Sequence, residues 1–181
     1  TRFDYMKDDL VFEDMSDSTN YAEMQGYLDI PNFIEFLMLS WYGAVTDWPG
    51  KNYWGGNRNT PTPSPFMFYN WDAEWSWDVT KDFPSVSGAW VHTSHRAGVE
   101  VEDVHSELWA SLRENDNFMM EFADRVYMHC FNEGALTDSS SLARWDTLNN
   151  YVRDAIIPES AKWGDRQIHL GNARHTRDLH W

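Results

Sequence analysis

The sequence contains a single cysteine, Cys130, among its 181 residues. One cysteine cannot form an internal disulfide, and zinc sites built from several cysteine thiolates are excluded for the same reason. Cys130 lies in an apolar helical pattern, so we expect a buried and unreactive thiol. The fold must be held by an apolar core, and 42% hydrophobic and 16% aromatic residues are enough to build one.

Basic residues and long apolar runs are also scarce. The 14 lysines and arginines are outnumbered by 29 aspartates and glutamates, which gives a formal net charge of −15. A chain this acidic repels phosphate backbones and anionic lipid, so we expect no nucleic-acid partner. No apolar run approaches the ~20 residues of a membrane span. The sequence opens at Thr1 without a signal peptide, and we expect a piece of a larger polypeptide.

The apolar spacing predicts a mainly helical chain. The pattern is clearest over residues 30–45, where Asp29 is the expected N-cap and Pro31 falls in the first turn. Two short helices are expected within residues 3–27. Further helices are predicted around Leu108 and Leu112, from a cap at Asp116 to Asn132, and from Thr137 to a break at Pro158.

A small β element is predicted between these helices. Residues 51–56 fit a short strand with a glycine turn, and the alternate prolines of residues 60–65 indicate a surface connector. Over residues 66–78 the alternation places Trp71, Trp75 and Trp77 on one face, which we expect in the core, and acidic residues on the other. The expected class is therefore α+β, mainly α with a small β hairpin, in a single domain over residues 1–181.

Four oxygen-bearing side chains carry the pattern of a phosphoryl-transfer site. Asp47 and Asn52 stand in the order Asp-x-x-x-x-Asn, the spacing of a kinase catalytic loop. Asp72 follows about one hairpin later. Glu74 is expected on the same strand face as Asp72, where it is either a metal ligand or a solvated acid. Carboxylate oxygens suit a divalent metal such as Mg²⁺ or Mn²⁺. We therefore expect Asp47, Asn52 and Asp72 to line one cleft, where they orient a hydroxyl and hold metal.

The sequence resembles the CotH kinase family of spore-coat and secreted proteins. The segments that carry the resemblance are residues 27–36, 46–52, 71–75, 122–126, 131–137 and 159–165. The resemblance implies a protein-kinase-like fold that transfers a phosphoryl group from ATP to serine or threonine of a protein, with Mg²⁺ or Mn²⁺. It implies that Asp47 is the catalytic aspartate, that Asp72 holds metal and cofactor, and that Asn52 either does the same or stabilises the loop. It also implies that Glu74 replaces an acid often found as aspartate, and Asp72-x-Glu74 is similar to the metal motif of small-molecule kinases as well, which leaves the substrate class open. It also implies a secreted protein or one on the bacterial cell surface.

The sequence departs from a complete kinase in one respect. Neither a glycine-rich loop nor a strand lysine paired with a helix glutamate occurs upstream of Asp47. We therefore expect a kinase-like C-terminal lobe that lacks the nucleotide-binding lobe. Such a lobe would bind metal without holding ATP, and the rest of the parent polypeptide or a protein substrate would be its partner.

Two other functions remain open. A non-catalytic extracellular module could bind glycans or mediate adhesion through a flat exposed strip of Trp48, Trp54 and Trp90. A metal-dependent hydrolase could use the same carboxylates to activate water. A histidine zinc site is not expected, because the spacing of the histidines matches no compact zinc motif; these are His92, His95, His169, His175 and His180.

Overall fold

The computed structural model describes residues 1–45, 48–73, 76–77 and 103–164. Some residues to which the sequence analysis assigned a role or a position lie outside this part of the chain: Asp47, Glu74, Trp75, Trp90, His92, His95, His169, His175 and His180. The chain divides into two compact units, Thr1–Met128 and His129–Trp181. The expected single domain over residues 1–181 stays a prediction.

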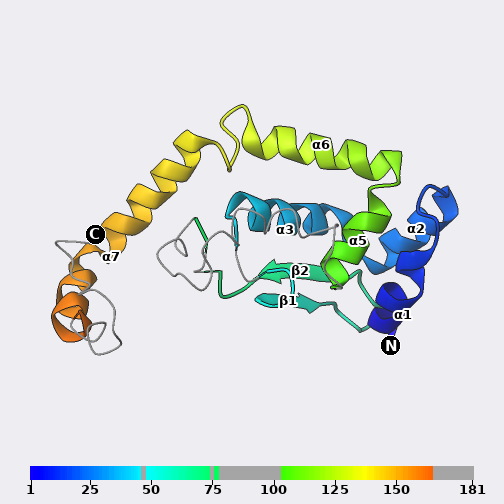
Figure 1. The fold of residues 1–181 in the computed structure, drawn as a ribbon, viewed down its shortest axis with the longest axis horizontal. Helices are drawn as coiled ribbons and strands as arrows, with labels where there is room; N and C mark the ends of the chain where they lie inside the picture. Colours follow the sequence, from blue (N-terminus) through cyan, green and yellow to red (C-terminus); the bar gives the residue numbers. More distant parts are fainter. Residues whose placement is uncertain (46–47, 74–75, 78–102, 165–181) are drawn as a thin grey trace, which may run out of the picture. The chain divides into compact units, whose positions relative to one another are not determined.

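Helices predominate among the described residues, and their one sheet has two antiparallel strands, so the predicted α+β class is confirmed. In chain order the elements are α1 (Arg2–Asp8), the 3₁₀ helix η1 (Leu10–Phe12), α2 (Ser18–Tyr27), α3 (Ile30–Tyr42), β1 (Tyr53–Gly56), β2 (Met67–Asn70), α5 (Val104–Leu112), α6 (Asp116–Cys130) and α7 (Asp138–Trp163) (Figure 1).

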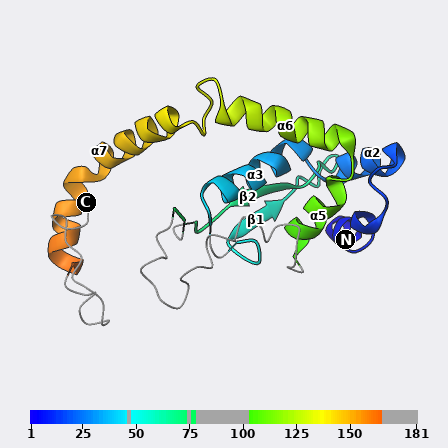
Figure 2. The same ribbon diagram turned by 45° about the horizontal axis from the view of Figure 1, so that its top comes forward.

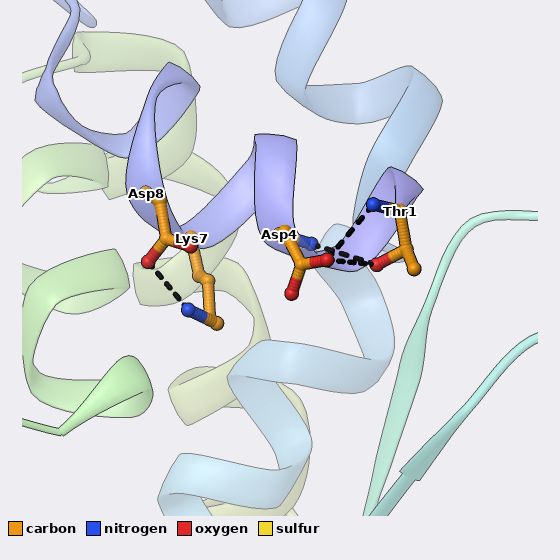
Figure 3. A network of polar contacts seen from close by, with 4 residues as sticks. All are labelled: Thr1, Asp4, Lys7 and Asp8. Atoms are coloured by element: carbon orange, nitrogen blue, oxygen red, sulfur yellow. Dashed lines mark hydrogen bonds and ion pairs between the residues drawn. The ribbon is translucent and has the colours of Figure 1, made fainter.

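The two short helices predicted near the start of the chain are α1 and α2, with η1 between them. Figure 3 shows how Thr1 and Asp4 cap each other: the Asp4 N–H donates to Thr1 Oγ1 at 3.2 Å, and the Thr1 hydroxyl donates to Asp4 Oδ2 at 2.7 Å. Lys7 forms an ion pair with Asp8 at the other end of α1. The Asp17 carboxylate starts α2 by accepting two backbone N–H groups, at 2.7 and 3.4 Å.

The central helix is α3. The Asp29 carboxylate accepts the N–H of Asn32 at 3.0 Å and Pro31 lies in the first turn, so the predicted start is confirmed. The helix ends at Tyr42, earlier than predicted, because Ala44 has a φ of 47°, outside the right-handed helical region. Its buried residues are Ile30, Phe33, Ile34, Phe36, Leu37, Met38 and Ser40. Each large apolar side chain buried here contributes about 1.5–3 kcal/mol.

The hairpin of β1 and β2 lies along α3 (Figures 1 and 2). Its register pairs Tyr53 with Asn70 and Gly55 with Phe68. Phe68 is 1% exposed, and its ring centroid lies 6.0 Å from that of Phe33 and 5.6 Å from that of Phe36. A Cβ on Gly55 would lie 2.9 Å from the Phe68 ring, so a larger residue at this position would have to displace that buried ring.

The predicted long strand of residues 66–78 is wrong in its extent. The strand β2 ends at Asn70, and Asp72 takes a φ of 53°, which breaks the extended backbone. The core placement of the tryptophans is also wrong where it can be examined, because Trp71 is 59% and Trp77 is 63% exposed. With only two strands, the face of the hairpin away from α3 has no covering layer among the described residues.

The predicted helices after the long loop are α5 and α6. The cap of α6 is Asn115 rather than Asp116, because the Asn115 Oδ1 accepts the N–H groups of Asn117 and Phe118 at 3.0 and 3.2 Å. The Asn115 amide also donates to the Met15 carbonyl at 2.7 Å and so ties the loop before α2 to α6. Cys130 is half-buried, so its predicted burial is wrong in degree.

The last helix, α7, starts at Asp138 after the N-cap Thr137, which agrees with the start predicted near these two residues, but it continues through Pro158 to Trp163. The predicted break at Pro158 is wrong because the proline is exposed, and the carbonyl that loses its N–H donor there can bond to water. None of the described side chains of α7 is fully buried. No helix in the described part of the chain is long and apolar enough to cross a membrane.

Candidate functional site

Two of the predicted site residues meet at the open end of the hairpin. Asn52 directly precedes β1, and Asp72 is the second residue after the end of β2. The Asn52 side-chain amide donates to the Asp72 carbonyl at 3.2 Å, and the Trp71 N–H donates to the Asn52 carbonyl at 3.2 Å. Asn52 and Asp72, which are far apart along the chain, are therefore direct neighbours in space.

Both residues have left-handed backbone conformations, with a φ of 64° at Asn52 and 53° at Asp72. Asparagine and aspartate adopt this region more readily than other residues with a side chain. The conformation ends the strand pairing at both positions and turns the two residues out of the sheet. Asp72 is exposed and Asn52 is half-buried, so the carboxylate is accessible to a ligand in water.

A polar clamp from α3 fixes β2, the strand that leads to Asp72. The Asn32 amide donates to the Phe68 carbonyl at 3.1 Å, and the Phe68 N–H donates to Asn32 Oδ1 at 2.7 Å. Farther along, the Asn70 amide donates to Ser40 Oγ at 2.7 Å. The buried Ser40 hydroxyl donates in turn to the Phe36 carbonyl at 2.9 Å. The two Asn32 bonds satisfy main-chain groups on the β2 edge that lacks a strand partner, and the Asn70 bond ties the end of β2 to α3.

The same edge is held at its start and beyond Asp72. The Asp29 N–H donates to the Phe66 carbonyl at 2.9 Å, and the Phe66 N–H donates to the Tyr27 carbonyl at 2.6 Å. After Asp72, the Trp77 N–H donates to the Gly43 carbonyl at 2.8 Å. Backbone hydrogen bonds to residues next to both ends of α3 therefore lie before and after Asp72 in the chain. They restrict the position of the Asp72 backbone although its side chain is exposed.

Residues 48–51, which lead into Asn52, are anchored by Trp48. Its indole is 2% exposed and packs edge-on against Phe36, with ring centroids 5.8 Å apart. The predicted exposed strip of Trp48, Trp54 and Trp90 is therefore wrong at Trp48. Trp54 is 61% exposed, and Trp90 lies outside the described residues.

A buried ionisable pair lies below this segment. The His105 ring is fully buried, and its Nδ1 is 3.5 Å from Asp103 Oδ1. Burial lowers the pKa of His105, and the Asp103 carboxylate and the Pro49 backbone oppose this shift. Burial raises the pKa of Asp103, but hydrogen bonds from His105 and Ser106 outweigh it and hold that pKa below its usual value. Because both pKa values are lowered, the pair at neutral pH is a neutral imidazole beside an ionised carboxylate.

The donor atoms of the described site fit a hard divalent cation. Asn52 and Asp72 supply amide and carboxylate oxygens, the ligands that Mg²⁺ and Mn²⁺ prefer. Asp47 and Glu74 lie outside the described residues, so their predicted roles stay predictions. Within the described ranges, no group of three or more histidine, cysteine, aspartate and glutamate side chains is arranged to hold a metal ion.

Sequence reasoning missed Asn32 and Ser40, which fix β2, and the buried His105. Asn32 and Ser40 lie on α3, where almost every other inward-facing position is apolar. A buried polar side chain within an apolar helix face needs a hydrogen-bond partner, and this was the signal that could have identified Asn32 and Ser40. The helix pattern alone does not show that the partner is β2.

The comparison with known protein families gives one match that covers most of the chain. A family model described as CotH kinase protein matches residues 3–178. The chain belongs to the CotH kinase family. The match covers nearly the whole chain, including the hairpin, α3 and the segment of Asp47, and the resemblance on the sequence motifs is confirmed. No curated protein and no solved structure matches the chain.

Proposed function

We propose that this CotH family member takes part in phosphoryl transfer from ATP to serine or threonine of a protein substrate, with Mg²⁺ or Mn²⁺ as cofactor. The observation that carries the proposal is the contact between Asn52 and Asp72 across the end of the hairpin. Kinases hold their metal with an amide and a carboxylate from two such segments. Membership of a kinase family supports the same chemistry.

The proposed roles follow from the type of each side chain. Asp47 accepts the proton of the attacking hydroxyl, and the oxygens of Asn52 and Asp72 hold the cation, with Glu74 as a further ligand. The bound cation supplies charge that neutralises the phosphate oxygens. The bond from Asn52 to the Asp72 backbone keeps the two ligands in register, so little ordering is left to the moment of binding.

The chain in this proposal is the catalytic and metal-binding half of the enzyme and corresponds to a kinase-like C-terminal lobe. The residues before Asp47 contain no glycine-rich loop, so the proposal assigns no nucleotide-binding residues upstream of Asp47. The chain alone therefore binds metal and has little or no kinase activity. The proposed location is extracellular or on the bacterial cell surface.

Metal binding by the chain alone tests the proposal. Titration of Mn²⁺ or Mg²⁺ into the wild type and into Asp72→Asn is measured by calorimetry. Asparagine is the suitable replacement because it removes the charge and tolerates the left-handed φ of 53°. We expect the variant to lose at least about tenfold in affinity, since even outer-shell changes at metal sites cost this much.

The matched control is Asp124→Asn, an exposed aspartate on α6. This variant changes the net charge by the same amount, so it measures how much of the affinity comes from general attraction of cations to an acidic protein. The proposal requires wild-type affinity in Asp124→Asn. Equal Mn²⁺ or Mg²⁺ affinity in Asp72→Asn and the wild type would show that Asp72 is not a metal ligand and would contradict the proposal.

A second candidate function is glycan or adhesion binding by the uncovered face of the hairpin. Trp54, Tyr69 and Trp71 are 61%, 52% and 59% exposed, and the indoles of Trp54 and Trp71 lie 6.1 Å apart in an edge-on pair. Flat aromatic faces of this kind can stack on sugars. Tryptophan fluorescence during titration with oligosaccharides tests it: a saturable change that Trp54→Ala abolishes supports it, and an unchanged spectrum rejects it.

A further inference from the structure

The helix α7 is long and has large apolar side chains exposed to water. It contains 26 residues, and none of its described side chains is fully buried. Leu142, Trp145 and Leu148 are 62%, 67% and 63% exposed. A helix in water is stabilised mainly by the packing of an apolar face, and no element in the described part of the chain covers this one.

The side chains of α7 follow the spacing of a helix that pairs with another helix. Alternating intervals of three and four residues separate the members of one stripe, which are Leu142, Trp145, Asn149, Val152 and Ile156. Residues at this spacing line one side of a helix, and in coiled coils they interdigitate with the same kind of stripe on a second helix. Four of the five are apolar, so this α7 stripe is suited to a helix as its partner.

Two residues of opposite charge flank the α7 stripe. Asp146 directly follows Trp145, and Arg153 directly follows Val152, so both lie on the same side of the stripe, two helical turns apart. Both are exposed. Neither has an oppositely charged residue three or four positions away along α7, where an ion pair within the helix would form. Their charges are therefore not paired within α7 itself.

The order of these charges is complementary to a second copy of α7 that runs in the opposite direction. When two antiparallel copies overlap over the full length of α7, the first residue of each lies opposite the last residue of the other. The same alignment places Trp145 opposite Ile156. It also brings Asp146 of each copy within two residues of Arg153 of the other, a distance that the long arginine side chain can span. Two reciprocal ion pairs then flank the paired stripes.

A parallel pair of helices lacks this complementarity. In a parallel pair, Asp146 and Arg153 would face the residues five positions earlier in the second copy, which are Ser141 and Leu148 and carry no charge. The antiparallel alignment also places Asn149, the polar member of the stripe, next to the two-fold axis. A polar residue at such a position fixes the register of paired helices. The charges and the asparagine therefore favour the same antiparallel register.

The charge of α7 also favours a second copy over a membrane. The four acidic and three basic residues of α7 give a net charge of −1, against −15 for the whole chain; they are Asp138, Asp146, Asp154, Glu159, Arg144, Arg153 and Lys162. Two copies therefore meet with little repulsion at this helix. Helices that bind anionic membranes carry an excess of lysine and arginine on their polar face, which α7 does not have.

We propose that the α7 stripe is a homodimerisation site, at which two copies of the chain pair their α7 helices in antiparallel orientation about a two-fold axis next to Asn149. A two-fold interface uses the same surface on both copies, as the reciprocal pairs of Asp146 with Arg153 require. The inference uses residues of α7 alone and does not depend on the proposed metal site.

Sedimentation equilibrium of the full chain over a range of concentrations tests the proposal. The mass of the wild type should rise toward twice the monomer mass. Asp146→Arg places like charges together at both symmetric positions and should raise the dissociation constant of the dimer about tenfold. The double variant Asp146→Arg with Arg153→Asp exchanges the two charges and should return the dissociation constant to about the wild-type value.

The matched control is Asp154→Arg. It makes the same change of charge on the side of α7 that faces away from the stripe, and it should leave the dissociation constant within about twofold of the wild type. All these variants should keep the wild-type helix content, because no described side chain of α7 is fully buried. Circular dichroism checks this.

Four results would overturn the inference. A wild type that is monomeric at every concentration shows that no second copy covers the stripe. A dimer that is equally strong in Asp146→Arg forms through another surface. A double variant that stays as weak as Asp146→Arg excludes the antiparallel pairing of Asp146 with Arg153. An equal loss in Asp154→Arg assigns the effect to net charge.

Discussion

Asn52 and Asp72 combine a chemical role with a backbone requirement. Their left-handed φ values of 64° and 53° are reached at low cost by glycine, asparagine and aspartate only. The residue types that suit a metal ligand are thus also those that suit the turn out of the strand. A substitution that removes the ligand oxygen and also disfavours the left-handed φ cannot show which of the two changes causes its effect.

The backbone requirement predicts an inverted order of stability at position 52. Asn52→Ala should be less stable than Asn52→Gly by about 1 kcal/mol, because the left-handed region penalises Cβ. Both variants lose the hydrogen bond to the Asp72 carbonyl, so that loss cancels in the comparison. Urea unfolding measures the difference, and an alanine variant as stable as the glycine variant would show that this φ is wrong.

At the residue scale, motif spacing predicted Asn52 and Asp72 as site residues, and their roles stay predictions. The structure shows that the two residues are neighbours, which a shared cleft requires. The burial of His105 was not predicted, because the apolar pattern of its helix does not show whether a histidine there is buried. Its surroundings depend on Trp48 and Tyr53, which only the folded chain brings to it.

Among the elements, β2 depends most on its neighbours. A two-stranded hairpin is marginal alone, and β2 is stabilised because Asn32 bonds to both main-chain groups of Phe68. The side chain of Asn32 thus replaces part of a third strand. The hairpin places Asp72, so the helix that supplies this clamp contributes to the site.

The clamp predicts a large effect of a small change. Asn32→Ala leaves the Phe68 N–H and carbonyl without partners and should cost about 2 kcal/mol or more, since each unpaired buried group costs about 1–3 kcal/mol. The matched control is Asn117→Ala on the exposed face of α6, expected within about 0.5 kcal/mol of the wild type. Comparable losses in the two variants, measured by chemical unfolding, would show that the clamp is unimportant.

The elements also show where periodicity fails as a predictor. The start of α3 follows from Asp29 and Pro31, which act locally, and was predicted correctly. The extent of β2 was overestimated because alternation continues in the sequence after the pairing strand has ended. The length of α7 was underestimated because the effect of Pro158 depends on its exposure, a tertiary property that sequence patterns do not contain.

The whole molecule should lose stability on mild acidification because of the pair Asp103 and His105. The pKa of His105 is lowered from 6.5, so below this pH the unfolded chain takes up a proton that the folded chain does not. Stability is therefore fully present above pH 6.5 and falls as the pH drops, by up to about 1.4 kcal/mol per pH unit. The lowered pKa of Asp103 acts in the same direction at lower pH, below the usual aspartate pKa of 3.8.

Thermal unfolding across this pH range checks the prediction. The wild type should have a constant melting temperature above pH 6.5 and a falling one just below it. In His105→Phe this first decline should be absent, while the acid denaturation at lower pH remains. A decline of equal size in both proteins would assign the pH dependence to other groups.

Family membership and the α+β class were both predicted correctly for the molecule as a whole. They could be predicted because they depend on motifs and periodicities spread along the entire chain. The catalytic half of the proposal remains a prediction, since it depends on Asp47 and Glu74 as well as on the described pair.

The most direct test of the central claim is the broadening of backbone amide signals by Mn²⁺ in NMR spectra of the full chain. We predict that substoichiometric Mn²⁺ broadens the signals of Asn52, Trp71 and Asp72 first, and that Asp72→Asn removes this selectivity. If the acidic segment around Asp14 and Asp17 broadens first while the signals of Asn52 and Asp72 stay sharp, the metal site is not at the hairpin and the account is contradicted.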